Sequence, residues 1–417
     1  MAYCMRHVTE DILWVGASDR RLALFENLFP LPNGVSYNAY LLLDEKTALM
    51  DTVDASVAHR QMENVAQALG GRALDYLVVN HLEPDHCANI LDILSQYPEA
   101  RLVITDKGLK LLNQFYDCDL GERVLLVKEG DQLTLGKHVL RFIAAPMVHW
   151  PEVTMAFDET DGVLFSADAF GTFGALSGSI FADELPFARD WLADARRYYA
   201  NIVGKYGVQV QNVLKKAASL PIKMICPLHG PIWREDLGYI LGKYDLWSRG
   251  VPEARAVAIF YGSMYGHTEN AADILAVQLA EAGVQNIVAY DVSKTDVSYL
   301  ISELFRVSHV VLAAPTYNNN LYRPMETLLS DMKALCLHDR TFALIENGSW
   351  APQSGKLMSY ALGEMKNMTV LTPTATLRSA LTPATREALS RLAEAVARDV
   401  AGAGNEEARG TGRREDN

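Results

Sequence analysis

The sequence predicts an α/β protein with two domains, and three observations support this. The chain has 417 residues, which is more than one ordinary hydrophobic core accommodates. Short apolar runs alternate with stretches of helical periodicity, as in proteins whose helices pack on sheets. The alternation stops at a short linker, Gly250–Glu253, and starts again at Ala256. We therefore expect one domain over 1–250, a second over 254–400 and a tail over 401–417.

Composition restricts the class of protein. A formal net charge of −13 argues against nucleic acid or an anionic membrane surface as the main partner. The five cysteines form no Cys-x-x-Cys pair, which excludes a disulfide framework, a zinc ribbon and a rubredoxin-type iron site. No signal peptide or membrane-spanning apolar run is apparent, so we expect a cytoplasmic protein. The tail is rich in glycine and charge without an apolar face, which predicts disorder.

The first half begins with two strands over Tyr37–Thr52, joined by a polar turn at Asp44–Lys46. Helical periodicity over Val57–Leu69 ends at the pair Gly70 and Gly71. Further strands and one helix follow, each marked by its own apolar run. They are expected at Tyr76–Val79, Ala88–Tyr97 (the helix), Leu102–Thr105, Val124–Val127 and Val139–Ala144.

The stretch His81–His86 follows the apolar strand that ends at Val79. Alternate residues of an extended segment point the same way, so His81, Glu83 and Asp85 can converge on one point. One imidazole and two carboxylates at this spacing make a candidate metal site. The alternative is a polar loop with its charges in water.

Three more candidate ligands follow apolar strands in the same half. His149 lies just past a strand, Asp168 ends the strand that begins at Gly162, and His229 ends the strand that begins at Met224. A lone histidine at a strand end is more often structural than a ligand. Four strand ends that all carry ligand-type side chains favour the metal interpretation.

The second half starts with the strand Ala256–Tyr261, a Ser/Gly/Thr turn and the helix Asn270–Glu281. Hydroxyl groups and free backbone amides at a strand-to-helix turn make a phosphate cradle, although alone such a turn is more often a plain cap. The turn has neither the Gly-Lys-Ser/Thr ending of a Walker loop nor the pattern G-x-G-x-x-G.

Two further loops, after the strands Val310–Ala313 and Phe342–Glu346, strengthen the ligand interpretation. Loops that follow parallel strands meet at one edge of the sheet, where doubly wound folds bind ligands. For Asn318–Asn320 the alternative is a turn with nothing bound. The candidate cofactor-binding residues are Ser263, Met264, Tyr265, Gly266, His267, Thr268, Pro315, Thr316, Tyr317, Asn318, Asn319, Asn320, Asn347, Gly348, Ser349, Trp350 and Ala351.

The series of ligands in the first half resembles the metallo-β-lactamase fold, an αββα sandwich whose hydrolases usually carry His-x-His-x-Asp-His. Here Glu83 replaces the second histidine, a harder ligand that moves preference from zinc toward iron. This substitution resembles the flavodiiron proteins (A-type flavoproteins). The resemblance implies that His81, Glu83 and His149 hold one iron, that Asp85 and His229 hold the other, and that Asp168 bridges them. His86 matches a ligand of the wider superfamily; we expect it to support the site by hydrogen bonding from outside.

The second half, over about Ala254–Arg398, resembles flavodoxin, a doubly wound parallel sheet that binds FMN. The resemblance implies that Ser263–Thr268 hold the FMN phosphate and that the other two loops flank the ring, with Trp350 as a stacking partner. Electrons would enter at FMN and pass to the iron pair. The implied activity is reduction of nitric oxide to nitrous oxide, of dioxygen to water, or of both. The implied partners are an external donor such as rubredoxin and a second copy of the chain in a head-to-tail homodimer.

Two alternatives remain open at this point. The first is a dizinc hydrolase fused to a flavodoxin domain, against which Glu83 argues. The second is an electron carrier whose first domain has lost its metal, against which the six filled ligand positions argue. Tyr198 or Tyr199 could donate protons at the site, although a structural role is the more common one for a tyrosine.

Overall fold

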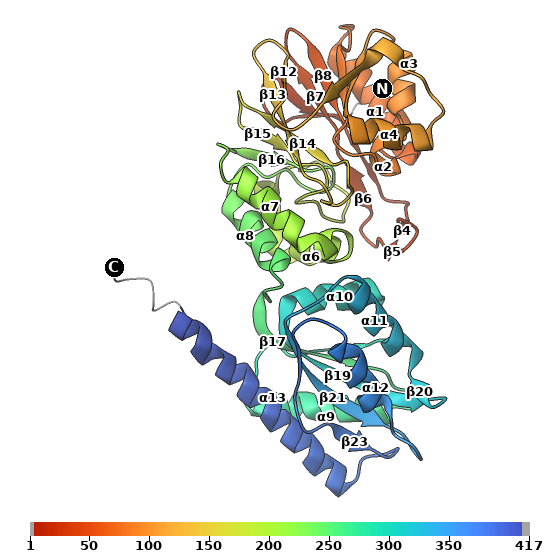
Figure 1. Cartoon of the computed structure of the whole chain (residues 1–417), viewed down its shortest axis with the longest axis vertical. Coiled ribbons are helices and arrows are strands. Elements are labelled where there is room, and N and C mark those ends of the chain that lie inside the picture. The colour runs from red at the N-terminus through yellow and green to blue at the C-terminus, as the bar shows by residue number, and fades with distance from the viewer. Residues whose placement is uncertain (1–3, 411–417) are drawn as a thin grey trace. The chain divides into compact units, whose positions relative to one another are not determined.

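The computed structural model describes residues 4–410 of the chain, with side chains up to residue 402. It divides between Ser248 and Arg249 into two compact units (Figure 1).

The first unit contains two large sheets. One has the strand order β1-β2-β7-β8-β9-β10-β11 and the other the order β12-β13-β14-β15-β16. Two short ribbons, β3 with β6 and β4 with β5, complete it. The strands of the first sheet are β1 (Arg6–His7), β2 (Ile12–Trp14), β7 (Tyr40–Leu43), β8 (Thr47–Met50), β9 (Tyr76–Val78), β10 (Arg101–Thr105) and β11 (Val124–Val127). The others are β12 (Gln132–Thr134), β13 (Val139–Ala144), β14 (Thr154–Asp158), β15 (Val163–Phe165), β16 (Met224–Cys226), β3 (Ala17–Asp19), β6 (Val35–Tyr37), β4 (Leu24–Phe25) and β5 (Phe29–Pro30).

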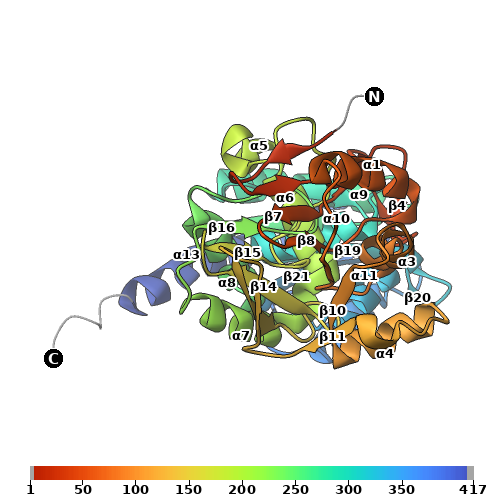
Figure 2. The ribbon, with the colours of Figure 1, turned by 90° about the horizontal axis from the view of Figure 1, so that it is seen from above.

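The two sheets face each other across one hydrophobic core. Leu42 and Val78 of the first sheet belong to the same buried cluster as Phe142 and Phe165 of the second. Figures 1 and 2 place α1 (Ala58–Leu69), α3 (Ile90–Gln96) and α4 (Asp106–Phe115) on the side of the first sheet. They place α7 (Gly207–Ala217) and α8 (Leu237–Ser248) on the side of the second. The remaining short helices are η1 (Ala55–Val57), α2 (Pro84–Cys87), η2 (Gly121–Arg123), η3 (Ala182–Glu184), α5 (Phe187–Asp190), α6 (Leu192–Tyr198), the π-helical η4 (Tyr199–Val203) and η5 (Gly204–Tyr206).

The second unit is a doubly wound parallel sheet. Its order is β18-β17-β19-β21-β22, the order of the flavodoxin-like class. The strand β23 pairs in parallel with β21, and β20 pairs antiparallel with β19. The strands are β17 (Ala254–Tyr261), β18 (Val288–Asp291), β19 (Val307–Tyr317), β20 (Asn320–Leu321), β21 (Arg340–Asn347), β22 (Met368–Val370) and β23 (Ala375–Leu377).

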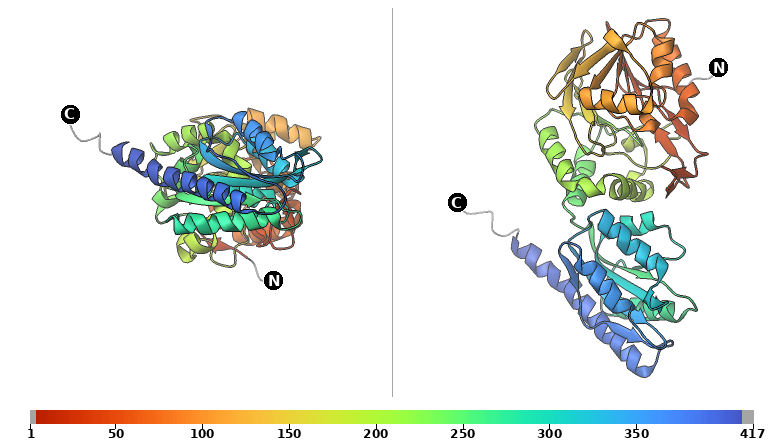
Figure 3. Two further views of the ribbon diagram at one scale, coloured as in Figure 1. Left: turned by 90° about the horizontal axis from the view of Figure 1, so that it is seen from below. Right: turned by 45° about the vertical axis from the view of Figure 1, so that its right-hand side comes forward.

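Helices cover both faces of this sheet, as Figure 3 shows from below. On one face α9 (His267–Glu281) and α13 (Pro383–Gly410) share a buried cluster with the strands, to which Leu275 and Leu392 belong. On the other face lie α10 (Val297–Arg306), α11 (Arg323–Ala334) and α12 (Ser354–Gly363). The predicted fold class, an αββα sandwich followed by a flavodoxin-like sheet, is confirmed.

The tail predicted over 401–417 lies only partly within the described residues. The helix α13 continues through residues 401–410, where we expected disorder, and residues 411–417 lie outside the described part. No helix of the described residues is long and apolar enough to cross a membrane.

Candidate functional site

Loops that follow four strands of the first unit converge on one buried site. His81 and Glu83 follow β9, His149 lies between β13 and β14, Asp168 follows β15 and His229 follows β16. All five residues are at most 9% exposed. The loops come from both sheets, so the sandwich itself brings them together.

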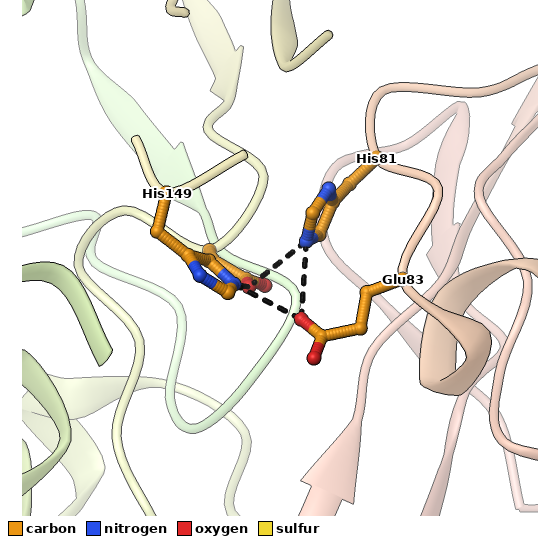
Figure 4. A group of neighbouring side chains, drawn as sticks. His81, Glu83 and His149 are labelled. Atoms are coloured by element: carbon orange, nitrogen blue, oxygen red, sulfur yellow. Dashed lines mark hydrogen bonds and ion pairs between the residues drawn. The ribbon is translucent and has the colours of Figure 1, made fainter. Parts of the chain in front are cut away.

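The first group of donor atoms comprises His81, Glu83, His149 and Asp168. The Oε2 atom of Glu83 lies 3.3 Å from Nε2 of His81 and 2.9 Å from Nε2 of His149. The Oδ2 atom of Asp168 lies 3.4 Å and 3.1 Å from the same two nitrogens. Figure 4 shows the side chains of His81, Glu83 and His149 pointing toward one another.

The second group comprises Asp85, His86 and His229. The Oδ2 atom of Asp85 lies 3.3 Å from Nε2 of both histidines. The other oxygen of Asp168, Oδ1, lies 3.2 Å from Nε2 of His86 and 3.7 Å from Nε2 of His229. Asp168 therefore turns one oxygen toward each group, which is the position of a bridging carboxylate.

The donor set fits a pair of metal ions. The Nε2 atoms of His86 and His229 face each other at 3.0 Å, and both oxygens of Asp85 are buried without a hydrogen bond within the described residues. Such crowding of electron-rich atoms is costly unless a cation lies between them. Imidazole and carboxylate ligands together suit iron and the neighbouring transition metals.

One expectation about the stretch His81–His86 needs correction, and another stays a prediction. Asp85 does not converge with His81 and Glu83 along an extended segment; it belongs to the second group. Pro84 begins the short helix α2, because proline is favoured at the first helical position, and the helix turns Asp85 away. His86, which we expected to support the site by hydrogen bonding from outside, has its Nε2 among the donor atoms of the second group, and its role stays a prediction.

Charge pairing dominates the electrostatics of this site. Burial alone would raise the pKa of Asp168, but His81 and His86 outweigh it and hold that pKa well below its usual range. Burial likewise opposes protonation of His149, yet Asp168 and Glu83 raise its pKa to about 9. The carboxylates thus stabilise positive charge at the position where metal ions would lie.

Several residues that sequence reasoning missed hold the ligand loops. Asp51 is buried after β8; its Oδ1 accepts hydrogen bonds from the backbone N–H groups of Asn80 (2.7 Å) and His81 (3.3 Å). The sequence contained a signal for Asp51, because it is an acid directly after an apolar strand, as Asp168 is. The Nδ1–H of His229 donates to the carbonyl oxygen of Ser36 at 2.8 Å. This bond directs the Nε2 atom of His229 toward the site.

The packing of Tyr198 and Tyr199 shows which of the two lies against a candidate metal ligand. The ring of Tyr198 lies 5.5 Å from the ring of His229, and its hydroxyl is buried without a hydrogen bond within the described residues. Tyr199 packs instead on Tyr244 and Trp247. Burial, with the charge of Asp168, raises the pKa of Tyr198 well above its usual value, so its proton is retained.

The second unit contains a cavity of about 780 Å³ at the edge where β17, β19 and β21 end. It is lined by every predicted cofactor-binding residue except two, and by Ser379, which sequence reasoning missed. Gly266 does not line it; with φ of +87° it precedes α9. Asn320 lines a neighbouring cavity of about 600 Å³ beside α11 instead.

Side-chain hydrogen bonds tie the loops of this cavity together. The Oγ1 atom of Thr316 accepts bonds from the backbone N–H groups of Gln353 and Ser354, at 2.8 and 3.1 Å. The Nδ2 atom of Asn347 donates to Oγ1 of Thr268 at 3.3 Å and to the carbonyl oxygen of Ser379 at 3.0 Å. The cavity is therefore preformed, and it offers the N-terminus of α9 for an anionic group.

Comparisons with known proteins agree with the fold of both units. Residues 35–230 match the model of the ODP family of beta lactamases, and residues 259–350 match that of flavodoxin. A nitric oxide reductase of Moorella thermoacetica is 32% identical over 89% of this chain and 92% of its own. The rubredoxin oxygen:oxidoreductase of Desulfovibrio gigas superimposes with a TM-score of 0.89 at 28% identity, over 95% of this chain and 99% of that one. The flavodiiron protein of Giardia intestinalis gives 0.89 at 26% identity, over 96% and 98%.

Fold and site together define a two-domain protein in which a lactamase-type metal domain precedes a flavodoxin domain. Relatives with the same two domains match nearly the whole of this chain. The chain belongs to the flavodiiron protein family, as its ligand pattern predicted.

Proposed function

We propose that this chain is an FMN-dependent oxidoreductase whose diiron site reduces nitric oxide to nitrous oxide, dioxygen to water, or both. The observation that carries the proposal is the position of Asp168, which presents one oxygen to each of two groups of ligands. The names of the relatives, a nitric oxide reductase and an oxygen oxidoreductase, supply the two gases.

We assign His81, Glu83 and His149 to one iron, Asp85, His86 and His229 to the other, and Asp168 to both. His86 extends the set that the sequence predicted. Bound iron would supply single-electron chemistry and open coordination positions for a diatomic gas, and bound FMN would take electrons singly and pass on two. Glu83 argues against the dizinc hydrolase, and the convergence of all the ligands argues against a metal-free carrier.

The chain's own residues have separate tasks in this proposal. Buried loops exclude water from the ligands, which strengthens every electrostatic interaction there. Tyr198 packs against the ring of His229 and keeps its proton, which makes it the candidate proton donor of the site. In the second unit, Ser263–Thr268 would hold the phosphate of FMN, and Trp350 would contact its ring.

We further propose a head-to-tail homodimer that accepts electrons from a rubredoxin-type donor. Apolar side chains are exposed at both sites: Tyr265 (88%) and Trp350 (84%) beside the flavin cavity, Leu28 (60%) on the β4–β5 turn and Phe115 (44%) against Trp150. Exposed apolar surface of this kind is typical of interfaces. The relative from Desulfovibrio gigas carries rubredoxin in its name. Five free cysteines favour a reducing compartment, the cytoplasm.

The test is the metal and flavin content of protein purified without oxygen from iron-supplemented cells. We expect about two irons and one FMN per chain, and consumption of nitric oxide or dioxygen with reduced rubredoxin as donor. Zinc with FMN would revive the hydrolase, and FMN without metal would indicate the carrier. Sedimentation of the loaded protein tests the dimer.

A further inference from the structure

Glu152 connects two of the ligand loops. It lies three residues after His149, and its Oε1 atom is 2.8 Å from Nδ1 of His81 and 2.9 Å from the backbone nitrogen of Leu82. The side chain is 4% exposed, and its second oxygen has no hydrogen-bond partner within the described residues. The loop that carries one ligand thus holds the imidazole of another.

The two groups of ligands are otherwise matched. Each contains two imidazoles and one carboxylate of its own, and the two share Asp168. The two groups differ in the partner of the Nδ1 atom, which is the imidazole nitrogen that faces away from the metal position. His81 is backed by the carboxylate of Glu152, whereas His229 is backed by the neutral carbonyl of Ser36 and Nδ1 of His86 has no partner within the described residues.

A carboxylate behind a ligating imidazole has two effects. It accepts the Nδ1 proton, which leaves Nε2 free to bind the metal, and it makes the imidazole a stronger donor of electrons. In a buried position the negative charge is poorly screened, so the second effect is large. The ring of Trp150 packs at right angles to that of His81, with 5.4 Å between the ring centroids, and helps to exclude water there.

We propose that Glu152 is a positioning residue that fixes the tautomer of His81 and makes the iron bound by His81, Glu83 and His149 the harder of the two to reduce. The inference rests on the proposed function, because it requires two metal ions at this site. It implies that the half-reduced protein keeps its ferric ion in the first group. The difference between the two iron potentials comes from Glu152, which contacts the ligand His81, because the two sets of ligands are themselves alike.

A purely structural role makes a different prediction. For such a role any neutral acceptor would satisfy the N–H groups of Leu82 and His81. If Glu152 only closed the loop, removing its charge while keeping its acceptor would change no property of the metals.

The experiment compares Glu152→Gln, Glu152→Leu and the matched control Glu99→Gln, which changes an exposed glutamate of the same unit. Metal affinity is measured by chelator competition with Fe²⁺ and, separately, Co²⁺. The two iron potentials are measured by titration monitored through the mixed-valence EPR signal. FMN content and thermal unfolding check that each variant folds.

We expect Glu152→Gln to retain both irons and to narrow the gap between their potentials by raising the lower one. Glu152→Leu should lower metal affinity in the first group by about 10- to 100-fold, with the second metal and FMN retained. Glu99→Gln should match the parent in every measurement.

Unchanged potentials in Glu152→Gln would overturn the electrostatic role, and parental metal affinity in Glu152→Leu would overturn the positioning role. Failure of the proposed function looks different. A parent that binds Co²⁺ but no iron would contradict the diiron reductase, while the Co²⁺ affinities of the variants would still test the role of Glu152.

Discussion

The metal centre and the flavin cavity are built in opposite ways. The metal centre consists of buried side chains from four distant loops, held by carboxylate–imidazole contacts. The flavin cavity consists of successive loops at one sheet edge, and its largest side chains, Tyr265 and Trp350, are exposed. A metal site loses its metal when any one of its donor atoms is removed. A cavity lined by several loops binds its ligand through many contacts, so the loss of one contact costs less affinity. The metal centre should therefore fail at single substitutions that the flavin cavity tolerates.

The largest effect is expected from Asp168→Ala. Loss of the carboxylate that faces both groups should remove iron and lower gas reduction by more than about 100-fold, since even outer partners of metal ligands are worth 10- to 100-fold. FMN should stay at the parental level, because its cavity belongs to the other unit. Iron and flavin analysis with nitric oxide and dioxygen electrodes provides the measurement. Asp92→Ala, at an exposed position of α3, is the control; retained turnover in Asp168→Ala would refute the diiron assignment.

A smaller effect is expected from Thr268→Ala in the flavin cavity. The change removes the hydroxyl that accepts the bond from Asn347 and lines the expected phosphate position. One such hydrogen bond is worth about 1 kcal/mol, so FMN should dissociate roughly fivefold more readily. Fluorescence titration of the apoprotein measures this, and Thr268→Ser should restore affinity. An unchanged FMN affinity would count against the phosphate loop.

Trp350→Ala should weaken FMN binding only a few-fold. Aromatic stacking adds about 0.5–1.5 kcal/mol, and the side chain is 84% exposed, so the fold should not depend on it. Tyr360→Ala removes another exposed aromatic, on α12 outside the cavity, and should leave FMN binding unchanged. Equal FMN affinity in the two variants would show that Trp350 does not stack on the ring.

The smallest effect concerns His138 in the first unit. Its Nδ1 lies 3.1 Å from Oδ2 of Asp158 and its Nε2 lies 3.4 Å from Oδ2 of Asp11, so each ring nitrogen has a carboxylate partner. The hydrogen bond to Asp158 raises the pKa of His138 above its ordinary value. Its contribution to stability is therefore complete below about pH 6.5 and is lost as the pH rises through the folded-state pKa.

The measurement is urea unfolding of the parent and of His138→Gln across this range. The free energy of unfolding of the parent should exceed that of the variant most at acidic pH. This difference in free energy should shrink as the pH rises. A difference that grows with pH would reverse the sign and refute the charged state of His138.

Local pattern predicted the fold class, because strand ends and parallel βα loops repeat along the chain in a form that periodicity detects. It also located the loops of both sites, and the replacement of histidine by Glu83 identified the family. Tertiary packing decided the rest. Which group Asp85 joins depends on the helix that Pro84 begins, and the contact of Glu152 with His81 joins residues 71 positions apart, which no local pattern encodes.

The sequence by itself determined the kinds of donor atoms and the order in which strands deliver them. Only the tertiary structure decided which atoms share a metal and which side chain lies behind each ligand. The physical reason is that ligand chemistry belongs to the single residue, whereas distance and burial arise when two sheets close on one core. Asp168 illustrates both: its carboxylate was recognisable as a ligand, but its place between the two groups exists only in the folded chain.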